Sequence, residues 1–203
     1  MDFEFIEKLS SKSPTPGGGG VSALIGSLGT ALGGMVCNLT IGKKKYEIYE
    51  EEVKEILDEV TYIQKRLFDL IKEDEDNFIP LSKAYSLPSS TDEEKKIKKE
   101  TMQSCLKKAS EVPLEVIRIS NKAIKHHERL LGKSTILAIS DIGVGIQCLR
   151  ASVLSSKLNV IINIKDITDT NFVKKVEDEM NFLVDESIKI CDRVYEEVLS
   201  SMK

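Results

Sequence analysis

The sequence predicts an all-α protein, an antiparallel bundle of long helices around a buried Gly/Ala-rich central helix. Long segments repeat apolar residues every three or four positions, which is the spacing of one face of a helix. Short breaks rich in Gly, Pro or Ser separate these segments, so consecutive helices are expected to pack antiparallel. No repeated strand pattern is present, and the β-like stretch 159–164 is too isolated to build a sheet, so we expect a helix end or buried connector there.

Length and composition indicate one soluble domain spanning residues 1–203. Charged residues make up 31% and apolar residues 41%, as in globular proteins. A net charge of −4 gives no electrostatic footprint for nucleic acid. The four cysteines show no C-x-x-C pairing, and the acidic first residues are unlike a secretory signal. We therefore expect a cytoplasmic protein.

Residues 16–45 organise the chain. A proline and four glycines precede an uncharged helical run, and three lysines follow it. The glycines within the run each cost about 1 kcal/mol of helix propensity, so another part of the protein is expected to approach this backbone closely. The bulky residues form one stripe: Val21, Leu24, Ile25, Leu28, Leu32, Met35, Val36 and Leu39.

A membrane span is the alternative for this run, because it is long enough and contains Gly-x-x-x-Gly at Gly29 and Gly33. Small and weakly polar residues occupy the rest of its circumference, whereas a lipid-facing helix needs bulky apolar groups all round. A buried central helix is therefore preferred.

The flanking elements follow from periodicity and caps. Residues 2–10 predict a short helix with Phe3, Ile6 and Leu9 inward. The longest periodic segment covers residues 44–78, and Asp74 continues its apolar seam. The pattern fails over residues 80–90, and LPSST at residues 87–91 is expected to form a turn.

The second half of the chain predicts three more helical segments. Thr91 and Glu94 have capping-box spacing for a helix that Pro113 is expected to kink or break, and that Gly132 ends. Residues 134–149 contain a single charge, Asp141. The last helix is expected to start near residue 169 or 170.

The glycines that open the central helix predict a loop that contacts a ligand, through Gly17, Gly18 and Gly19. Backbone N–H groups at a helix N-terminus can bind anions. No lysine follows in the Walker pattern and no strand precedes, so neither a P-loop nor a Rossmann site fits. A flexible loop is the other interpretation.

Asp74 and Asp141 are the candidate catalytic groups. A carboxylate among apolar residues has a partner or a shifted pKa, and such groups serve as acids, bases or ligand anchors. The structural alternatives are an ion pair for Asp74 and a helix N-cap for Asp141. His126 and His127 are adjacent, so they point about 100° apart on a helix; we expect surface roles and no metal site.

The pattern resembles the cyclodeaminase domain of formiminotransferase-cyclodeaminase together with stand-alone methenyltetrahydrofolate cyclohydrolases. The matching motifs lie in order along nearly the whole chain. They are the PGGG turn at residues 16–19, MVCNLTIGKKKYE at 35–47, Asp74 with Phe78, Leu87-Pro88, Val112-Pro113, Ser140-Asp141, and Asn159-Val160 with Ile162-Asn163. Two positions depart from the family pattern: Gly20 stands where many members have Ser, and Ser89 where Lys is common.

The resemblance implies a homodimeric enzyme acting on a tetrahydrofolate derivative, in its monoglutamylated or polyglutamylated form. It implies no metal or redox cofactor and no nucleic acid or membrane partner. It implies a cyclodeaminase that forms 5,10-methenyltetrahydrofolate and ammonia, or a cyclohydrolase that opens the methenyl bridge. Asp74 and Asp141 would anchor the pterin and relay protons, in an unassigned order. The implied substrate-binding residues, besides the three glycines, are Asn38, Lys43, Lys44, Tyr46, Asn159 and Asn163.

Two alternative interpretations remain open, one for the lysines and one for the whole chain. The three consecutive lysines also fit a solvated helix junction. The whole chain also fits a non-catalytic helical binding module, in which the buried acids form register-setting ion pairs.

Overall fold

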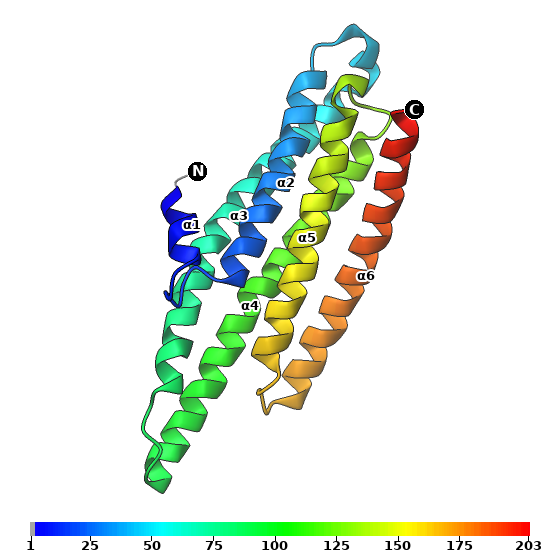
Figure 1. Ribbon diagram of the computed structural model, residues 1–203. Helices are drawn as coiled ribbons and strands as arrows, with labels where there is room; N and C mark the ends of the chain where they lie inside the picture. Colours follow the sequence, from blue (N-terminus) through cyan, green and yellow to red (C-terminus); the bar gives the residue numbers. More distant parts are fainter. Residues whose placement is uncertain (1–2) are drawn as a thin grey trace.

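The computed structural model describes residues 3–203, and all of its regular structure is helical (Figure 1). The all-α prediction is confirmed. The elements are α1 (Phe3–Leu9), α2 (Gly18–Thr40), the 3-10 turn η1 (Lys44–Tyr49), α3 (Glu50–Tyr85), α4 (Asp92–Leu130), the 3-10 turn η2 (Ile136–Ala138), α5 (Ile139–Ile164) and α6 (Thr170–Ser201).

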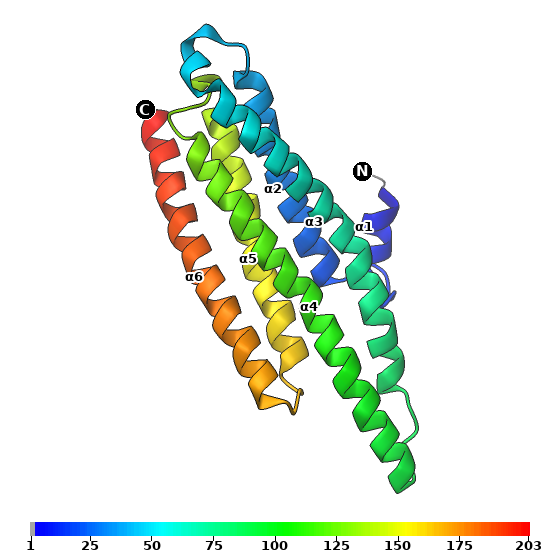
Figure 2. The ribbon, with the colours of Figure 1, turned by 180° about the vertical axis from the view of Figure 1, so that it is seen from behind.

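Helix α2 lies at the centre of the bundle and packs against α3, α4 and α5. Helix α6 covers the side of the bundle formed by α4 and α5 (Figure 1). Seen from behind, α3 and α4 extend past the other helices as a hairpin, and the short α1 lies outside them (Figure 2). The central position predicted for α2 is therefore confirmed.

The small residues of α2 form its buried face. A Cβ at Gly29 would lie 2.8 Å from the Gly145 carbonyl oxygen on α5, and a Cβ at Gly33 would lie 2.7 Å from the His127 ring. The predicted close approach of backbones is thus confirmed. The bulky stripe mostly faces outward instead, with Leu28, Met35 and Leu39 at 43–46% exposure.

His127 is completely buried where α2, α4 and α5 meet, so the surface role predicted for it is wrong. Its Nδ1 lies 2.9 Å from the Ala123 carbonyl oxygen and its Nε2 3.1 Å from that of Gly29. Burial lowers the pKa of this imidazole. A neutral ring has one N–H to donate, so His127 acts as a polar link between α4 and α2.

The helix ends predicted from capping residues are found in the structure, whereas those predicted from prolines are not. The capping box of Thr91 and Glu94 is present, Asp169 caps α6, and Gly132 with φ +69° follows the end of α4, as predicted. Helix α4 runs through Pro113 without a break, and α3 continues through Pro80 to Tyr85. Of the kink or break expected at Pro113, the break does not occur, and the end expected for α3 near residue 78 is wrong, because packing along a long helix outweighs one lost hydrogen bond. The turn expected at residues 87–91 lies between α3 and α4 and is confirmed.

Helix α1 does not bury the residues expected to face inward. Phe3, Ile6 and Leu9 are exposed or nearly so, and α1 contains no buried residue. The predicted inward face is wrong for the single chain. The prediction for residue 2 lies outside the described residues.

Two segments, Gly18–Thr40 and Ile136–Ile164, are long and apolar enough to cross a membrane by length and composition. The core helix of a soluble protein passes the same test, and one face of each segment packs within this bundle.

Candidate functional site

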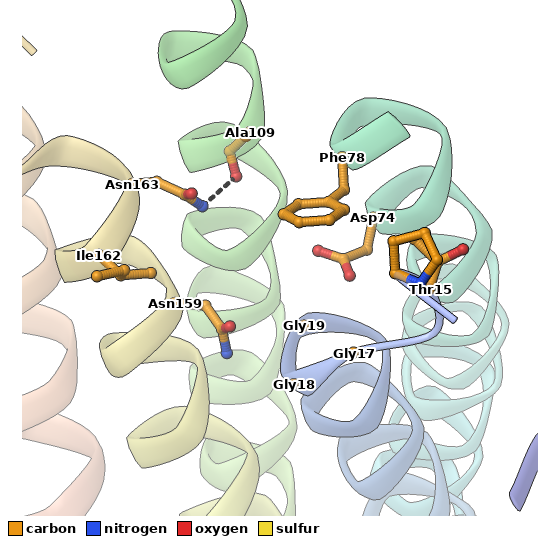
Figure 3. Close-up of a pocket in the computed structure, with 11 residues that line it drawn as sticks. Thr15, Gly17, Gly18, Gly19, Asp74, Phe78, Ala109, Asn159, Ile162 and Asn163 are labelled. Carbon is orange, nitrogen blue, oxygen red and sulfur yellow. Dashed lines mark hydrogen bonds between the residues drawn. The ribbon is translucent and has the colours of Figure 1, made fainter. Parts of the chain in front are cut away.

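A pocket of about 180 Å³ lies at the N-terminus of α2, between α3, α4 and α5 (Figure 3). It forms because α2 starts part-way along the longer α3 and α4, which leaves a space that the preceding loop borders. Its lining residues are Pro14, Thr15, Gly17, Gly18, Gly19, Asp74, Phe78, Ala109, Asn159, Ile162 and Asn163.

The first turn of α2 reaches this pocket as bare backbone. Gly17 is the N-cap and provides no side-chain hydrogen bond. The N–H of Gly20 donates to the Asp74 carboxylate, which lies on the facing turn of α3. Free N–H groups and the helix dipole make this end of α2 favourable for negative charge.

Asp74 has no ion-pair partner among residues 3–203, so the structural ion pair considered for it is not found. Burial raises the pKa of its carboxyl group, and the hydrogen bond from Gly20 only partly opposes this effect. Asp74 therefore combines partial burial, access to a pocket and a pKa shifted upward, which is the combination expected of a proton-transfer group.

Gly19 is required by this arrangement. A Cβ at position 19 would overlap the Asp74 carboxylate, so no other residue fits without moving that side chain. A Cβ at Gly18 would lie 3.3 Å from Oδ1 of Asn159, across the pocket. The glycine loop was predicted to allow close approach, and here it approaches Asp74 itself.

Two asparagines of α5 form the opposite wall (Figure 3). The amide nitrogen of Asn159 donates to the Ser155 carbonyl at 2.9 Å, and that of Asn163 donates to the Ala109 carbonyl at 2.9 Å. With the amides in this orientation, each Oδ1 remains an available acceptor. The ring of Phe78 and the side chain of Ile162 add apolar surface.

The remaining predicted site residues lie at the other end of the bundle. Lys43 donates to the Thr135 hydroxyl at 2.9 Å, and the Tyr46 hydroxyl accepts from the Ile136 N–H at 3.2 Å. Lys44 and Asn38 are exposed. At 1.5 Å per residue, the stretch of α5 from Asp141 to Asn159 spans roughly 27 Å, so the two groups share no cleft within one chain.

Asp141 lies half-buried in the first turn of α5 and does not cap it, because the helix begins at Ile139. The N-cap considered for Asp141 is therefore wrong. Within residues 3–203 there is also no cluster of three His, Cys, Asp or Glu side chains that could hold a metal ion.

Five lining residues were missing from the predicted site: Pro14, Thr15, Phe78, Ala109 and Ile162. Phe78 follows Asp74 by one helical turn, and Ile162 lies between the two asparagines on the same face of α5. The i, i+3 and i+4 spacing on a helix was the signal that would have found these two. Pro14, Thr15 and Ala109 reach the pocket only through tertiary packing.

The formiminotransferase-cyclodeaminase family model matches residues 3–182. The chain belongs to the formiminotransferase-cyclodeaminase family. A methenyltetrahydrofolate cyclohydrolase from Methylorubrum extorquens is 38% identical over 198 residues, which cover 98% of the chain and 95% of that protein. A formimidoyltransferase-cyclodeaminase from Gallus gallus is 33% identical over 189 residues, and the chain matches 34% of that longer protein.

The fold of this formiminotransferase-cyclodeaminase family member also matches a solved structure. The crystal structure of formiminotetrahydrofolate cyclodeaminase from Thermotoga maritima superimposes with a TM-score of 0.89 at 30% identity, covering 100% of this chain and 98% of that one. The resemblance inferred from the sequence motifs is confirmed.

Proposed function

We propose that the chain is a folate one-carbon enzyme whose chemistry takes place at the Asp74 pocket, with formiminotetrahydrofolate cyclodeaminase as the first candidate. The observation that carries this proposal is a half-buried carboxyl group without an ion-pair partner, set against a glycine turn, in a family whose relatives are named for such reactions. A carboxyl group whose pKa is raised is a stronger base when ionised, so it can both accept and return a proton during the reaction.

The deaminase reaction needs such a group. N10 of the substrate attacks the protonated N5-formimino carbon, and a tetrahedral intermediate forms with N5, N10 and an amino group on that carbon. The proton leaves N10 and reaches the amino nitrogen, so that ammonia departs and the 5,10-methenyl cation closes. Asp74 in its ionised form accepts the first proton and then donates it to the leaving group.

Methenyltetrahydrofolate cyclohydrolase is the second candidate, and the relative with 38% identity over nearly the same length supports it. Water adds to the methenyl carbon, the carbon–N5 bond breaks, and 10-formyltetrahydrofolate and one proton are released. Asp74 takes a proton from the attacking water and returns one to N5. Neither reaction requires a metal or redox cofactor.

The pocket also suits the substrate's polar ring. The free Oδ1 acceptors of Asn159 and Asn163 can receive ring N–H groups, and Phe78 offers an aromatic face for the ring. Gly17, Gly18 and Gly19 let the substrate approach the backbone. The glutamate tail is assigned to the lysine end, at Lys43 and Lys44.

We infer a homodimer in which two chains complete each site. The pocket volume of about 180 Å³ lies below the roughly 300–1,000 Å³ of ligand sites, so one chain encloses too little of a folate. Apolar side chains on the exposed faces of α2 and α5 form the proposed contact surface: Leu28, Met35, Leu39, Val144, Leu154, Leu158, Ile161 and Ile162. A groove lined by Ile25 and Val144 joins these two faces.

In the proposed dimer the two-fold axis passes through these faces perpendicular to the helices, so that α2 runs antiparallel to its copy. The end with Asn38, Lys43, Lys44, Tyr46 and Asp141 in one chain would then approach the Asp74 pocket of the other. In this arrangement Asp141 anchors the pterin, and Asp74 transfers the proton. We place this enzyme in the cytoplasm, with no nucleic acid or membrane as partner.

A paired absorbance assay tests the function. Gain of the methenyltetrahydrofolate signal from 5-formiminotetrahydrofolate, with ammonia release, supports the deaminase. Loss of the signal from methenyltetrahydrofolate, above the rate without protein, supports the hydrolase. No change in either direction would contradict both and favour the non-catalytic binding module.

A further inference from the structure

The loop before the glycine turn is fixed to α3 by a buried threonine. Thr15 is 5% exposed, and its hydroxyl group donates to Oε1 of Glu75 at 2.8 Å. The backbone oxygen of Thr15 accepts from the Ser13 hydroxyl at 2.5 Å. Both the side chain and the backbone of Thr15 are therefore held in place.

Glu75 follows Asp74 directly on α3, so two neighbouring carboxylates hold the two ends of one short turn. Glu75 accepts from Thr15 at the start of the turn, and Asp74 accepts from the Gly20 N–H at its end. Lys8 of α1 also reaches Oε1 of Glu75, at 3.1 Å, from the exposed side. Among the residues between, Gly19 lies directly against the Asp74 carboxyl group, since a Cβ there would overlap it.

We propose that Thr15 is a positioning residue of the Asp74 site, whose hydrogen bond to Glu75 holds the glycine turn over Asp74 and keeps water from its carboxyl group. The proposal deepens the proposed function, on which its relevance to catalysis rests. Thr15 acts through the turn and through Asp74, and it transfers no proton itself.

The surroundings of Asp74 make this proposal testable by titration. The residues that α4 and α5 contribute to the pocket are Ala109, Asn159, Ile162 and Asn163, none of which titrates. The charged groups near the turn are Glu75 and Lys72 on α3 and Lys8 on α1. Replacing Thr15 removes the hydrogen bond without removing a charge, so a change in the Asp74 titration would report water access.

The test compares Thr15→Val, which has a similar shape but no hydroxyl, with Thr15→Ser, which keeps the hydroxyl. The Asp74 carboxyl carbon is titrated by ¹³C NMR in the full chain. We expect the Asp74 midpoint in Thr15→Val to fall by about half a pH unit or more, a threefold change in proton concentration. Thr15→Ser should keep the wild-type midpoint. An unchanged midpoint in Thr15→Val would overturn the proposal.

Two further variants keep the result unambiguous. Lys8→Met removes the exposed ion pair and leaves the Thr15 bond, so the Asp74 midpoint should stay or rise, since a nearby positive charge is lost. Thr15→Ala removes the hydroxyl in a second way and should reproduce the fall if Thr15→Val does not fold. A fall in Lys8→Met equal to that in Thr15→Val would also overturn the proposal.

The titration needs no turnover, so it separates this proposal from the proposed function. If the wild-type chain converts neither folate, the function fails while the midpoint shift still decides the role of Thr15. If the chain is active, the acidic limb of its pH–rate profile should move with the Asp74 midpoint in Thr15→Val and return in Thr15→Ser.

Discussion

Asp74 lies where two effects on its charge oppose each other. The start of α2 and the Gly20 N–H favour the ionised carboxylate, whereas burial between α2 and α3 favours the neutral acid. Burial is the larger effect, so the pKa of this group is raised. An ionised carboxylate in this position lowers the stability of the fold. We therefore infer that Asp74 serves the function of the protein and not its stability.

The first prediction concerns stability. Because the folded pKa of Asp74 is raised, the native state retains a proton that the unfolded chain has released, and stability falls as the pH rises through that window. Asp74→Asn cannot ionise, so the variant does not lose stability in this way as the pH rises. We expect urea unfolding to give a more stable variant at pH 7 and no difference below pH ~3.8, the ordinary carboxyl value. A variant less stable at pH 7 would contradict the assigned burial.

The second prediction concerns Gly19. Gly19→Ala should displace the Asp74 carboxyl group, because the new Cβ would overlap it, and folate turnover should fall at least tenfold. The matched control is Gly34→Ala in the same helix, where a Cβ would make an ordinary contact of 3.7 Å with Val60. Full activity in Gly19→Ala would show that the carboxyl position is unimportant.

At the scale of the element, the face of α2 that packs inside the bundle is the one made of small residues. Gly26, Gly29 and Gly33 let α5 and His127 approach its backbone, so the helix gains contact with three neighbours instead of burying bulky groups. Such close approach leaves no room for an added methyl group, since protein interiors are close-packed.

The third prediction tests this packing. Gly29→Ala and Gly145→Ala should each lower the free energy of unfolding by about 1–3 kcal/mol, because the new Cβ atoms would lie 2.8 Å from the Gly145 carbonyl oxygen and 2.5 Å from His127. Gly34→Ala should instead raise it by up to about 1 kcal/mol through helix propensity. Equal effects of all three in urea unfolding would contradict the account.

The elements were largely predictable, and the errors have physical causes. Apolar spacing and caps located the six helices, because these are local signals. Spacing could not decide which side of α2 is buried, since both a bulky stripe and a small-residue stripe run along it. It also placed Phe3, Ile6 and Leu9 inward, although no residue of the short α1 is buried. His127 was misjudged because nothing local shows that three glycines surround its ring.

At the scale of the molecule, the predicted site residues fall into two groups at opposite ends of the bundle. Asp74 and the two asparagines were each identified from the sequence, and the fold brings them together. The distance to Asp141 was not predictable, because motifs give an order along the chain and no positions in space. A pairing of chains is what would join the two groups.

The fourth prediction tests that pairing. The wild-type chain should behave as a dimer by size-exclusion chromatography with light scattering, and Leu158→Glu should be monomeric with unchanged helical circular dichroism. Leu158 is 69% exposed on α5. Tyr62→Glu on α3, where Tyr62 is 67% exposed, is the control and should remain dimeric. A monomeric wild-type chain would contradict the proposal that two chains complete each site.

The central claim is that the Asp74 carboxyl group carries the folate chemistry. Its most direct measurement is the paired methenyltetrahydrofolate absorbance assay on the wild-type chain and on Asp74→Asn, with circular dichroism to verify the fold. We predict that the wild type converts 5-formiminotetrahydrofolate or methenyltetrahydrofolate, and that the variant does so at least tenfold more slowly. A folded Asp74→Asn variant with the full wild-type rate would contradict the claim.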